Sequence, residues 1–276
     1  MITLTRHEGD FSEFWSQQDP ASFSLSWLGQ AGFAVRAGSL RFLVDPYLSN
    51  SLEEKYRGSD KPHNRLMPPP VMVEDLSGLQ FVFCTHAHSD HMDPGTLPAI
   101  ARDIPNCRFV IPRAHVEKAR QFGLPPEAIL PLEAGESLEL PEGLSVRAIP
   151  AAHEQLQTDV AGHHLFLGYL WQWHGMTIYH SGDCVPYERL SNAIQTADLA
   201  LLPVNGRGKG VPGNFSFEEA ARLCVETKIP LFIPHHFGMF AFNTVDRDAL
   251  EKELERNFGP RVLLPDVSSW FSLNIR

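Results

Sequence analysis

The chain has 276 residues, of which 43% are hydrophobic and 20% are charged, a composition typical of a globular protein with a substantial core. Its formal net charge of −10 argues against nucleic acid as the main partner, because binding a polyanion usually requires a basic face. No apolar run approaches the roughly 20 residues of a membrane span, and the first residues lack the basic-then-apolar pattern of a signal peptide. We therefore expect a cytoplasmic protein with neither a nucleic-acid nor a membrane partner.

The first half of the chain is expected to alternate short strands with helices. Residues 23–46 predict two or three strands separated by glycine-containing turns, and residues 79–85 and 108–112 predict buried strands. Helices are expected near residues 94–103 and 114–122.

The second half repeats this order. Strands are expected in the stretches ESLEL, LSVRAIPAAH, LFLGYLWQW, MTIYHSGD and LFIPHH, and over residues 199–205. Ser216 with Glu219 three residues later has the pattern of a capping box, and Thr244 is expected to open an amphipathic helix over residues 244–258. Because strands and helices recur without a clear linker, we expect one layered α/β domain spanning residues 1–276.

The densest chemical signal is FVFCTHAHSDHMD, residues 81–93, where three histidines and two aspartates follow a short apolar run. His86 and His88 lie two apart at the end of a predicted strand, so in extended backbone they would share one face. Asp90 and His91 follow where the chain must turn, which lets their side chains point away from the first pair. One loop could thus offer imidazole and carboxylate ligands to two adjacent metal ions, and these ligands suit Zn, Mn, Fe or Ni.

Further ligands are expected at the ends of other predicted strands. His153 lies in IPAAHE, Asp183 lies in IYHSGDC, and His235 and His236 close LFIPHH. Enzymes with α/β folds place reacting groups at such strand ends. His180 precedes the SGD tripeptide, where it either hydrogen-bonds a ligand or is a satisfied core histidine.

The four cysteines, Cys84, Cys107, Cys184 and Cys224, are far apart and form no Cys-x-x-Cys pair, so neither a disulfide framework nor a thiolate zinc site is expected. Cys184 follows Asp183, where a thiolate could coordinate a metal. A cysteine in such a place is more often a small buried hydrophobic residue, and we favour that interpretation.

The chain resembles the metallo-β-lactamase fold superfamily, whose hallmark His-x-His-x-Asp-His loop is matched by THAHSDHMD. His153, the SGD tripeptide and the closing HHFGMF follow in the order of that family. The stretches WLGQAGF, Asp45-Pro46, YHSGD and LLPVNGR are similar to the L-ascorbate-6-phosphate lactonase-like group of metal-dependent hydrolases. The resemblance implies a four-layer αβ/βα sandwich with the site at one edge.

The resemblance also implies one or two divalent metal ions, with Zn or Mn expected ahead of Fe or Ni. The first ion would be held by His86, His88 and His153, Asp183 would bridge, and the second would be held by Asp90, His91 and His236. His235 would then be packed behind the ligands or hydrogen-bonded to one of them.

The implied activity is hydrolysis, in which a metal-bound hydroxide attacks a carbonyl or phosphoryl centre of a small anionic substrate. Asp90 would position the water or accept its proton, and His236 would act beside it at the second ion. The lactonase-like group suggests a lactone or ester of a phosphorylated sugar acid.

Two segments are candidates for substrate contacts. In NGRGKG, the residues Asn205, Arg207 and Lys209 could hold an anionic group, although a flexible basic surface loop is an equally good interpretation. Residues 47–75 are polar, proline-rich and long for a connection without secondary structure. By family position they would cover the metals as a lid, with His63 near the substrate, and the alternative is a solvated insertion.

Other functions stay open at this point. The same metals could attack phosphorus in a phospholipid or a cyclic nucleotide, which would make the protein a phosphodiesterase. A redox di-iron protein or a non-catalytic member is a further alternative, but the former would need a partner flavin domain. A homo-oligomer is compatible with the sequence.

Overall fold

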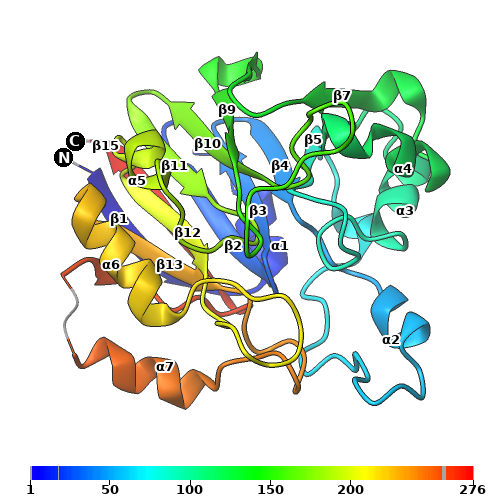
Figure 1. Ribbon diagram of the computed structural model, residues 1–276. Coiled ribbons are helices and arrows are strands. Elements are labelled where there is room, and N and C mark those ends of the chain that lie inside the picture. Colours follow the sequence, from blue (N-terminus) through cyan, green and yellow to red (C-terminus); the bar gives the residue numbers. More distant parts are fainter. Residues whose placement is uncertain (1, 18, 257–258, 276) are drawn as a thin grey trace.

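Two β-sheets pack face to face, and helices lie against their outer faces, in the computed structural model of the chain (Figure 1). The structure describes residues 2–17, 19–256 and 259–275. This arrangement confirms the predicted four-layer αβ/βα sandwich.

The first sheet has eight strands in the order β1-β15-β2-β3-β4-β5-β6-β7. The pairs from β1 to β4 are antiparallel, and those from β4 to β7 are parallel. The strands of this sheet are β1 (Ile2–Glu8), β2 (Phe23–Gly29), β3 (Gly32–Ala37), β4 (Leu40–Val44), β5 (Phe81–Phe83), β6 (Arg108–Pro112), β7 (Ile129–Leu132) and β15 (Ser269–Ile275).

The second sheet has seven strands in the order β14-β13-β12-β11-β10-β9-β8. Its pairs from β11 to β14 are parallel, whereas β10 runs antiparallel to both β9 and β11, so β9 and β11 point the same way. The strands of this sheet are β8 (Ser137–Glu139), β9 (Ser145–Pro150), β10 (Leu167–Trp173), β11 (Met176–His180), β12 (Leu199–Pro203), β13 (Leu231–His235) and β14 (Arg261–Val262).

The helices are short. Figure 1 shows α5 and α6 on the outer side of the second sheet, and α3 and α4 beside β5 and β7 of the first. The α-helices are α1 (Phe11–Ser16), α2 (Ser51–Lys55), α3 (Thr96–Asp103), α4 (Val116–Gln121), α5 (Leu190–Ile194), α6 (Phe217–Thr227) and α7 (Arg247–Leu254), and the 3-10 turns are η1 (Val73–Asp75), η2 (Arg113–His115), η3 (Pro126–Ala128) and η4 (Pro141–Gly143).

Alternation along the strands builds the core, as β4 illustrates. Phe42 and Val44 belong to the cluster between the two sheets, and the Phe42 ring lies 5.3 Å from that of Trp171 in the second sheet. Leu43 points to the opposite face and joins a second cluster with Phe14 of α1. Because successive side chains of a strand point to opposite faces, one strand contributes to two buried layers.

The two predicted helix starts had different outcomes. The capping box is confirmed, since the Ser216 hydroxyl accepts from the Glu219 backbone N–H and the Glu219 carboxylate accepts from that of Ser216. The prediction that Thr244 opens the last helix is wrong, because Asp246 caps α7 while the Thr244 hydroxyl accepts from the backbone N–H of Gly238. The predicted end of that helix, residues 257–258, lies outside the described residues.

Residues 47–75 are held by hydrogen bonds within the segment and to the loop that follows β13. The Arg65 guanidinium donates to the carbonyl oxygens of Tyr47 and Ser49 at 3.0 and 3.1 Å, and Leu66 N–H donates to the Met239 carbonyl at 2.9 Å. The segment therefore lies beside the loop that follows β13.

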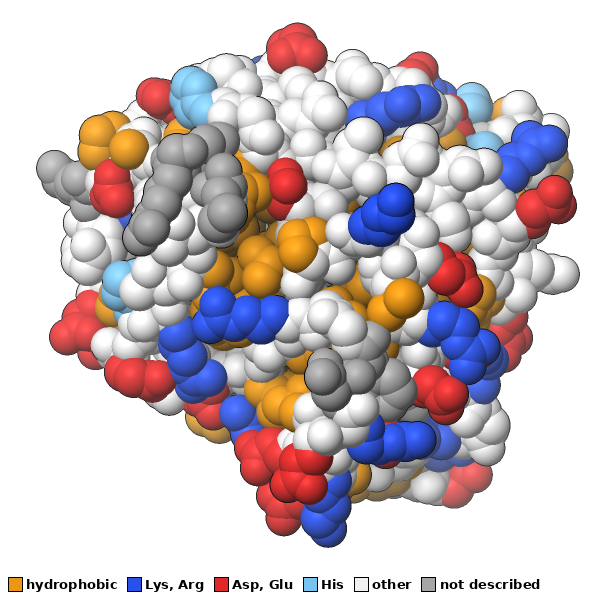
Figure 2. Space-filling view, turned by 90° about the vertical axis from the view of Figure 1, so that its left-hand side faces the viewer, with side chains coloured by type: hydrophobic (Ala, Val, Ile, Leu, Met, Phe, Trp, Pro, Cys, Tyr) orange, Lys and Arg blue, Asp and Glu red, His pale blue; other side chains and the backbone are white. Residues whose placement is uncertain are grey.

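On the face shown in Figure 2, acidic and basic side chains are interspersed, with small apolar areas between them. Within the described part of the chain, no helix is both long enough and apolar enough to span a bilayer.

Candidate metal centre

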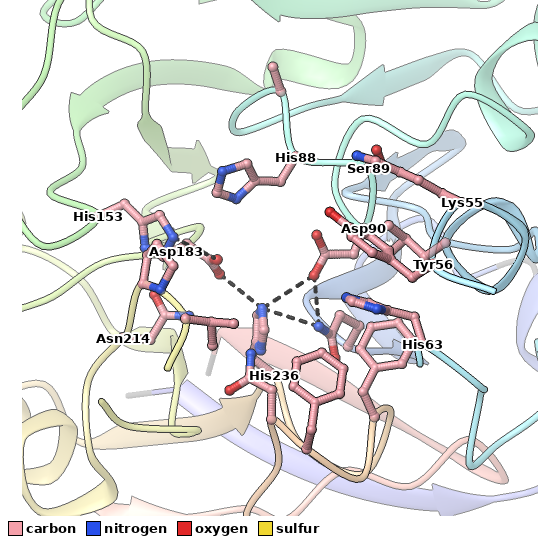
Figure 3. A pocket seen from close by; sticks show the side chains of 18 of the residues that line it. Lys55, Tyr56, His63, His88, Ser89, Asp90, His153, Asp183, Asn214 and His236 are labelled. Carbon is pink, nitrogen blue, oxygen red and sulfur yellow. Dashed lines mark hydrogen bonds and ion pairs between the residues drawn. The ribbon is translucent and has the colours of Figure 1, made fainter. Parts of the chain in front are cut away.

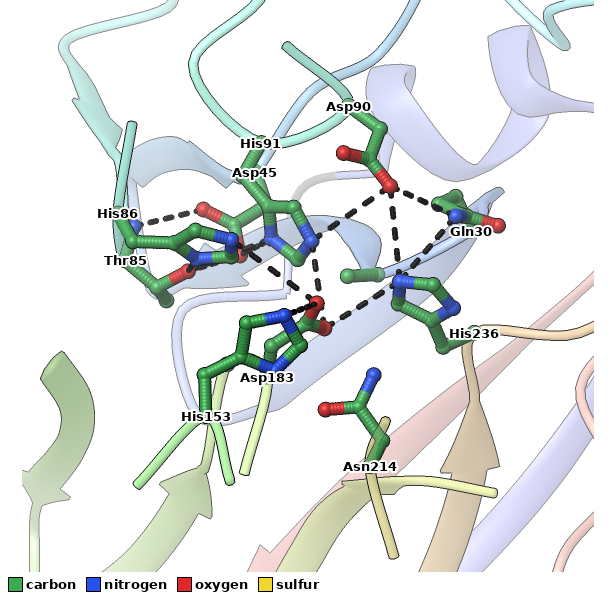
Figure 4. A network of polar contacts seen from close by, with 12 residues as sticks. Gln30, Asp45, Thr85, His86, Asp90, His91, His153, Asp183, Asn214 and His236 are labelled. Carbon is green, nitrogen blue, oxygen red and sulfur yellow. Dashed lines mark hydrogen bonds and ion pairs between the residues drawn. The ribbon is translucent and has the colours of Figure 1, made fainter. Parts of the chain in front are cut away.

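Loops that follow four strands bring the predicted ligands together (Figure 4). The strands β9, β11 and β13 run in the same direction, so their carboxyl ends meet at one edge of the second sheet. The loop after β5 of the first sheet reaches the same place. The contributing side chains are His86, His88, Asp90 and His91 after β5, His153 after β9, Asp183 after β11, and His236 after β13.

Six of these side chains, all except His153, form two groups that could each hold a metal ion. The first contains His86, His88 and Asp183, and the second contains Asp90, His91 and His236. Within each group the potential ligand atoms all lie within 4.8 Å of one another. The separation into two groups agrees with the pattern expected for the loop, although β5 ends at Phe83, so the histidines lie beyond the strand and not in extended backbone.

Asp183, a member of the first group, also faces the second. Its Oδ2 atom is 3.9 Å from Nε2 of His86 and 4.0 Å from Nε2 of His153. Its Oδ1 atom is 3.3 Å from Nε2 of His91 and 3.3 Å from Nε2 of His236. One carboxylate thus presents one oxygen to each set of imidazoles, which is the arrangement that a bridging ligand needs.

Asp90 completes the second group. Its Oδ2 atom is 3.5 Å from Nε2 of His236 and 3.8 Å from Nε2 of His91, and it accepts a hydrogen bond of 2.8 Å from the side-chain amide of Gln30. Gln30 was not identified as a site residue from the sequence, although it lies within the WLGQAGF stretch. Its amide nitrogen is also 3.2 Å from Nε2 of His236.

Several buried polar atoms of the centre lack a hydrogen-bond partner. They include Nε2 of His86, Nε2 of His91 and Oδ1 of Asp183, all on side chains that are at most 5% exposed. Buried polar atoms of folded proteins are almost always satisfied, so unpaired imidazole and carboxylate atoms that face one another fit the binding of a cation. The donor set of neutral nitrogens and carboxylate oxygens fits a divalent metal.

Thr85 and Asp45 orient the rings of His86 and His91 by contacting their Nδ1 atoms. Asp45 follows β4, and its Oδ2 atom lies 2.7 Å from Nδ1 of His91. The Thr85 hydroxyl donates to the same Asp45 oxygen at 2.6 Å and lies 3.0 Å from Nδ1 of His86. These contacts occupy the Nδ1 sides of the rings and leave the Nε2 atoms free to face Asp183.

Neighbouring carboxylates raise the pKa values of both histidines in the second group. Burial disfavours the charged form of His236, but Asp183 and Asp90 outweigh it and raise the pKa of His236 to about 9. Burial likewise opposes the charged form of His91, and Asp183, Asp45 and Asp90 together raise its pKa well above the usual range. Without a metal, these imidazoles would carry the positive charge that the carboxylates require.

In the first group, the pKa values of the two histidines are lowered instead. Burial holds the pKa of His86 well below its usual range. Desolvation by the surrounding protein also lowers the pKa of His88 to about 4, although this residue is partly exposed at the cavity. Both rings are therefore neutral near pH 7, which is the form in which imidazole binds a metal.

His180 and His235 form a buried pair behind the centre. Their rings stack at 4.8 Å with an interplanar angle of 10°. Nε2 of His180 lies 2.9 Å from the Ala31 carbonyl oxygen, and its Nδ1 accepts from the Gly182 backbone N–H. Neither ring nitrogen of His235 has a hydrogen-bond partner. The two rings thus pack beside the loops that carry Asp183 and His236, and neither belongs to a ligand group.

Cys184 lies beside Asp183 as a buried thiol. Its sulfur accepts from the Ala152 backbone N–H at 3.4 Å and lies 3.3 Å from the Val185 carbonyl oxygen. Burial raises the pKa of the thiol to about 12. These contacts support its interpretation as a packing residue, which also ties the loop of Asp183 to the loop of His153.

A cavity of about 290 Å³ opens onto the centre (Figure 3). Residues 47–75 contribute part of its wall, and Figure 3 shows His63 on the side of the cavity where Asp90 lies. The lining contributed by this segment is Leu52, Lys55, Tyr56 and His63.

The three side chains of the NGRGKG loop that were predicted to contact the substrate bond to other protein groups instead. Arg207 donates to the Asn214 carbonyl at 3.1 Å and pairs with Glu219, and Lys209 donates to the Asn205 carbonyl at 2.8 Å. The Asn205 amide donates to Asn243 at 3.0 Å. The structure does not bring these three side chains to the cavity, because partners within the loop and in neighbouring segments satisfy them. The cavity is lined instead by residues that follow NGRGKG in the sequence, namely Val211, Pro212 and Asn214.

Two amines that were not singled out as substrate contacts line the cavity instead. Lys118 of α4 donates to the carbonyl oxygen of Ala87, between His86 and His88, at 2.6 Å. Lys55 of α2 lies with its amine 5.0 Å from the centroid of the Tyr56 ring. Their positions depend on the folding of helices whose sequences show no catalytic pattern.

Comparison with known proteins identifies the family. The chain belongs to the Beta-lactamase superfamily domain family, whose model matches residues 40–237, more than half of the chain. A "UPF0173 metal-dependent hydrolase" of Aeropyrum pernix is 29% identical over 270 residues, covering 91% of this chain and 98% of that protein. The N-acyl-phosphatidylethanolamine-hydrolyzing phospholipase D 1 of Caenorhabditis elegans is 24% identical over 213 residues, covering 73% of this chain and 58% of that protein. The structure of an isothiocyanate hydrolase from Delia radicum gut bacteria superposes with a TM-score of 0.74 at 21% identity, covering 90% of this chain and 97% of that one.

Proposed function

We propose that the chain is a metal-dependent hydrolase that acts on a small anionic substrate in the cavity beside Asp183. The observation that carries the proposal is the position of the Asp183 carboxylate, with one oxygen facing His86 and His153 and the other facing His91 and His236. The name of the Aeropyrum pernix relative, a metal-dependent hydrolase, supports the same class.

We propose that the first ion is held by His86, His88 and His153 and the second by Asp90, His91 and His236, with Asp183 between them. Zn or Mn is the expected ion, because both accept imidazole and carboxylate ligands. When bound, such ions supply Lewis acidity, which lowers the pKa of a water molecule to about 7 and polarises the bond to be cleaved.

The protein itself would position the reactants. Asp90 combines a ligand position with exposure to the cavity, so it can hold a water molecule or accept its proton. In the metal-free protein, protonated His236, with Nε2 at 3.5 Å from Oδ2 of Asp90, would keep that carboxylate ionised. The amines of Lys55 and Lys118 line the same cavity and would attract the anionic part of the substrate.

A lactone or ester, such as that of a phosphorylated sugar acid, is the proposed substrate class. The basis is the similarity of WLGQAGF, YHSGD and LLPVNGR to the lactonase-like group. A phosphodiesterase that acts on a phospholipid or a cyclic nucleotide is the second candidate, which the phospholipase D relative favours. Both reactions would use the same ligands and differ in the atom attacked.

The test combines metal analysis with a hydrolysis screen. Protein purified without added ions would be analysed for metals, and a redox-active iron pair instead of Zn or Mn would contradict the hydrolase. Lactones, esters and bis-p-nitrophenyl phosphate would then separate carbonyl from phosphoryl chemistry. His86→Ala should lose turnover and the metal of its own ligand group, whereas His174→Asn, at an exposed histidine in the turn between β10 and β11, should keep the full metal content and turnover. If His86→Ala changes neither, the proposal is wrong.

A further inference from the structure

One wall of the cavity consists of aromatic rings. Tyr56 and His63 come from the segment 47–75, and Phe240 and Phe242 come from the loop after β13. All four line the same cavity as Asp90, and Figure 3 shows Tyr56 and His63 beside it.

These rings hold one another in a defined arrangement. The His63 ring stacks on that of Tyr56 at 4.0 Å with an interplanar angle of 19°. It meets Phe242 edge-on at 4.6 Å and Phe240 edge-on at 5.0 Å. Phe240 is only 2% exposed, whereas Tyr56, His63 and Phe242 are partly exposed and keep surface available to a ligand. The wall is thus built before any ligand arrives, which reduces the entropy lost on binding.

His63 contributes to the wall as a neutral ring. Its Nδ1 lies 2.8 Å from the Lys61 carbonyl oxygen, which can only accept, so Nδ1 carries the proton. Partial burial also lowers the pKa of this imidazole. A neutral ring offers a flat face of low polarity and does not repel a neighbouring cation.

The opposite side of the cavity is polar. Figure 3 shows the candidate ligands His88 and Asp183 and the side-chain amide of Asn214 across the cavity from Tyr56 and His63. Lys118, which also lines the cavity, donates to the Ala87 carbonyl oxygen in the His86–His91 loop. A ligand that fills the cavity must therefore present different chemistry to its two sides. The volume of about 290 Å³ restricts it to a small molecule.

We propose that this cavity binds a small substrate in which an aryl group is joined to the anionic, hydrolysable group, with the aryl ring against Tyr56, His63 and Phe242. The proposal rests on the proposed function for the identity of the polar side, but not for the aromatic wall. Aromatic rings gain from stacked and edge-on contacts beyond the area that they bury, so these three rings favour a flat unsaturated group over an alkyl chain of similar size.

The test uses two ligands that cannot be hydrolysed. Phenylphosphonate and methylphosphonate carry the same anionic group and differ only in the aryl ring. Titration calorimetry on the zinc-loaded protein should show that phenylphosphonate binds roughly tenfold more tightly or better, the effect expected for burying one aromatic ring. This preference is a ratio of dissociation constants, so it does not depend on turnover.

Three variants assign the preference to the wall. Phe242→Ala should remove most of the preference for phenylphosphonate while methylphosphonate binds as before. Phe242→Leu, which keeps an apolar side chain, should restore only part of it. Leu66→Ala removes a large side chain that is 58% exposed, lies in the same segment and does not line the cavity, and it should leave the preference unchanged.

Equal binding of the two phosphonates would overturn the proposal, as would a preference that survives Phe242→Ala. Full retention in Phe242→Leu would overturn its aryl part. If the protein prefers phenylphosphonate through Phe242 but hydrolyses no ester or phosphodiester, the result would support the aryl site and contradict the proposed function. Hydrolysis without any preference for phenylphosphonate would support the proposed function and exclude the aryl site.

Discussion

The Oδ2 atom of Asp45 lies 2.7 Å from Nδ1 of His91, and both side chains are fully buried. The Thr85 backbone N–H and hydroxyl also donate to this carboxylate, at 2.8 and 2.6 Å, so Asp45 is an acceptor in every contact. Nδ1 of His91 must therefore carry a proton, which leaves Nε2 as the atom that faces Asp183 and Asp90. One aspartate outside the ligand groups thus decides which nitrogen of a candidate ligand is available to a metal.

Replacing Asp45 with asparagine should weaken metal binding without abolishing it. Loss of the carboxylate removes the partner that fixes the His91 tautomer, and such changes typically cost about 10–100-fold in metal affinity. Competition with a chromophoric chelator would measure the affinity. Asp103→Asn, at an exposed residue of α3, is the matched control and should bind metal normally. Unchanged affinity in Asp45→Asn would refute the orienting role.

Asp183 and His86 should differ in how many ions their variants lose. Asp183→Asn should reduce the affinity for both ions, because its two carboxylate oxygens face different imidazole groups. His86→Ala should reduce the affinity only of the group that contains His86 and His88. Mass spectrometry of the metal content after dialysis against limiting chelator would count the retained ions. Asp183→Asn protein that retains one ion at full affinity would show that the carboxylate does not bridge.

Metal binding should release protons in a pH-dependent way. In the metal-free protein the pKa of His236 is raised to about 9 from an ordinary value of 6.5, so this imidazole is protonated near pH 7.5. A metal can bind His236 only after that proton leaves, so the affinity should rise as the pH increases from about 6.5 to about 9. Calorimetry in buffers with different heats of ionisation should detect more protons released at pH 7.5 than at pH 9.5. Equal release at both pH values would contradict the raised pKa.

The same shift has a consequence for the stability of the metal-free protein. A group whose pKa is higher in the folded state stabilises that state fully below its unfolded pKa and loses the effect as the pH rises through its folded pKa. The contribution of His236 should therefore be complete below about pH 6.5 and disappear as the pH approaches 9. Chemical denaturation of the metal-free protein, compared with His236→Gln across this range, would measure it. A stability difference between the two proteins that does not change with pH would exclude the effect.

Lys118 should contribute to the binding of anions. Its amine lies at the cavity and is held by the Ala87 carbonyl at 2.6 Å. Lys118→Met keeps most of the apolar stem and removes the charge, so methylphosphonate should bind about tenfold more weakly, consistent with the loss of one charge-assisted contact. Lys252→Met, at an exposed position of α7, is the control. Equal binding in both variants would show that Lys118 does not contribute to anion recognition.

The local part of the structure was predictable from the sequence. The capping box of Ser216 and the three strands between residues 23 and 46 depend on neighbouring residues and on the alternation of apolar side chains. The pairing of β1 with β15 was not predicted, because it joins Ile2–Glu8 to Ser269–Ile275 across almost the whole chain. A strand whose partner lies so far away leaves little local signal.

The candidate ligands were also visible in the sequence, because each of them ends a predicted strand or follows one and carries a side chain suited to metals. Their grouping, however, depends on tertiary structure. Only the packing of the two sheets places the loop of His86 against that of Asp183, and only the fold reveals that Arg207 pairs with Glu219 while Lys118 reaches the cavity.

The sequence by itself determined the type of chemistry, since imidazoles and carboxylates at this spacing have few other uses. The tertiary structure decided the surroundings of that chemistry, namely the Asp45 contact behind His91 and the aromatic wall around His63. The physical reason is that ligand identity is a property of single side chains. The shape and polarity of a cavity arise only when segments that are distant along the chain pack against one another, and no local pattern specifies that packing.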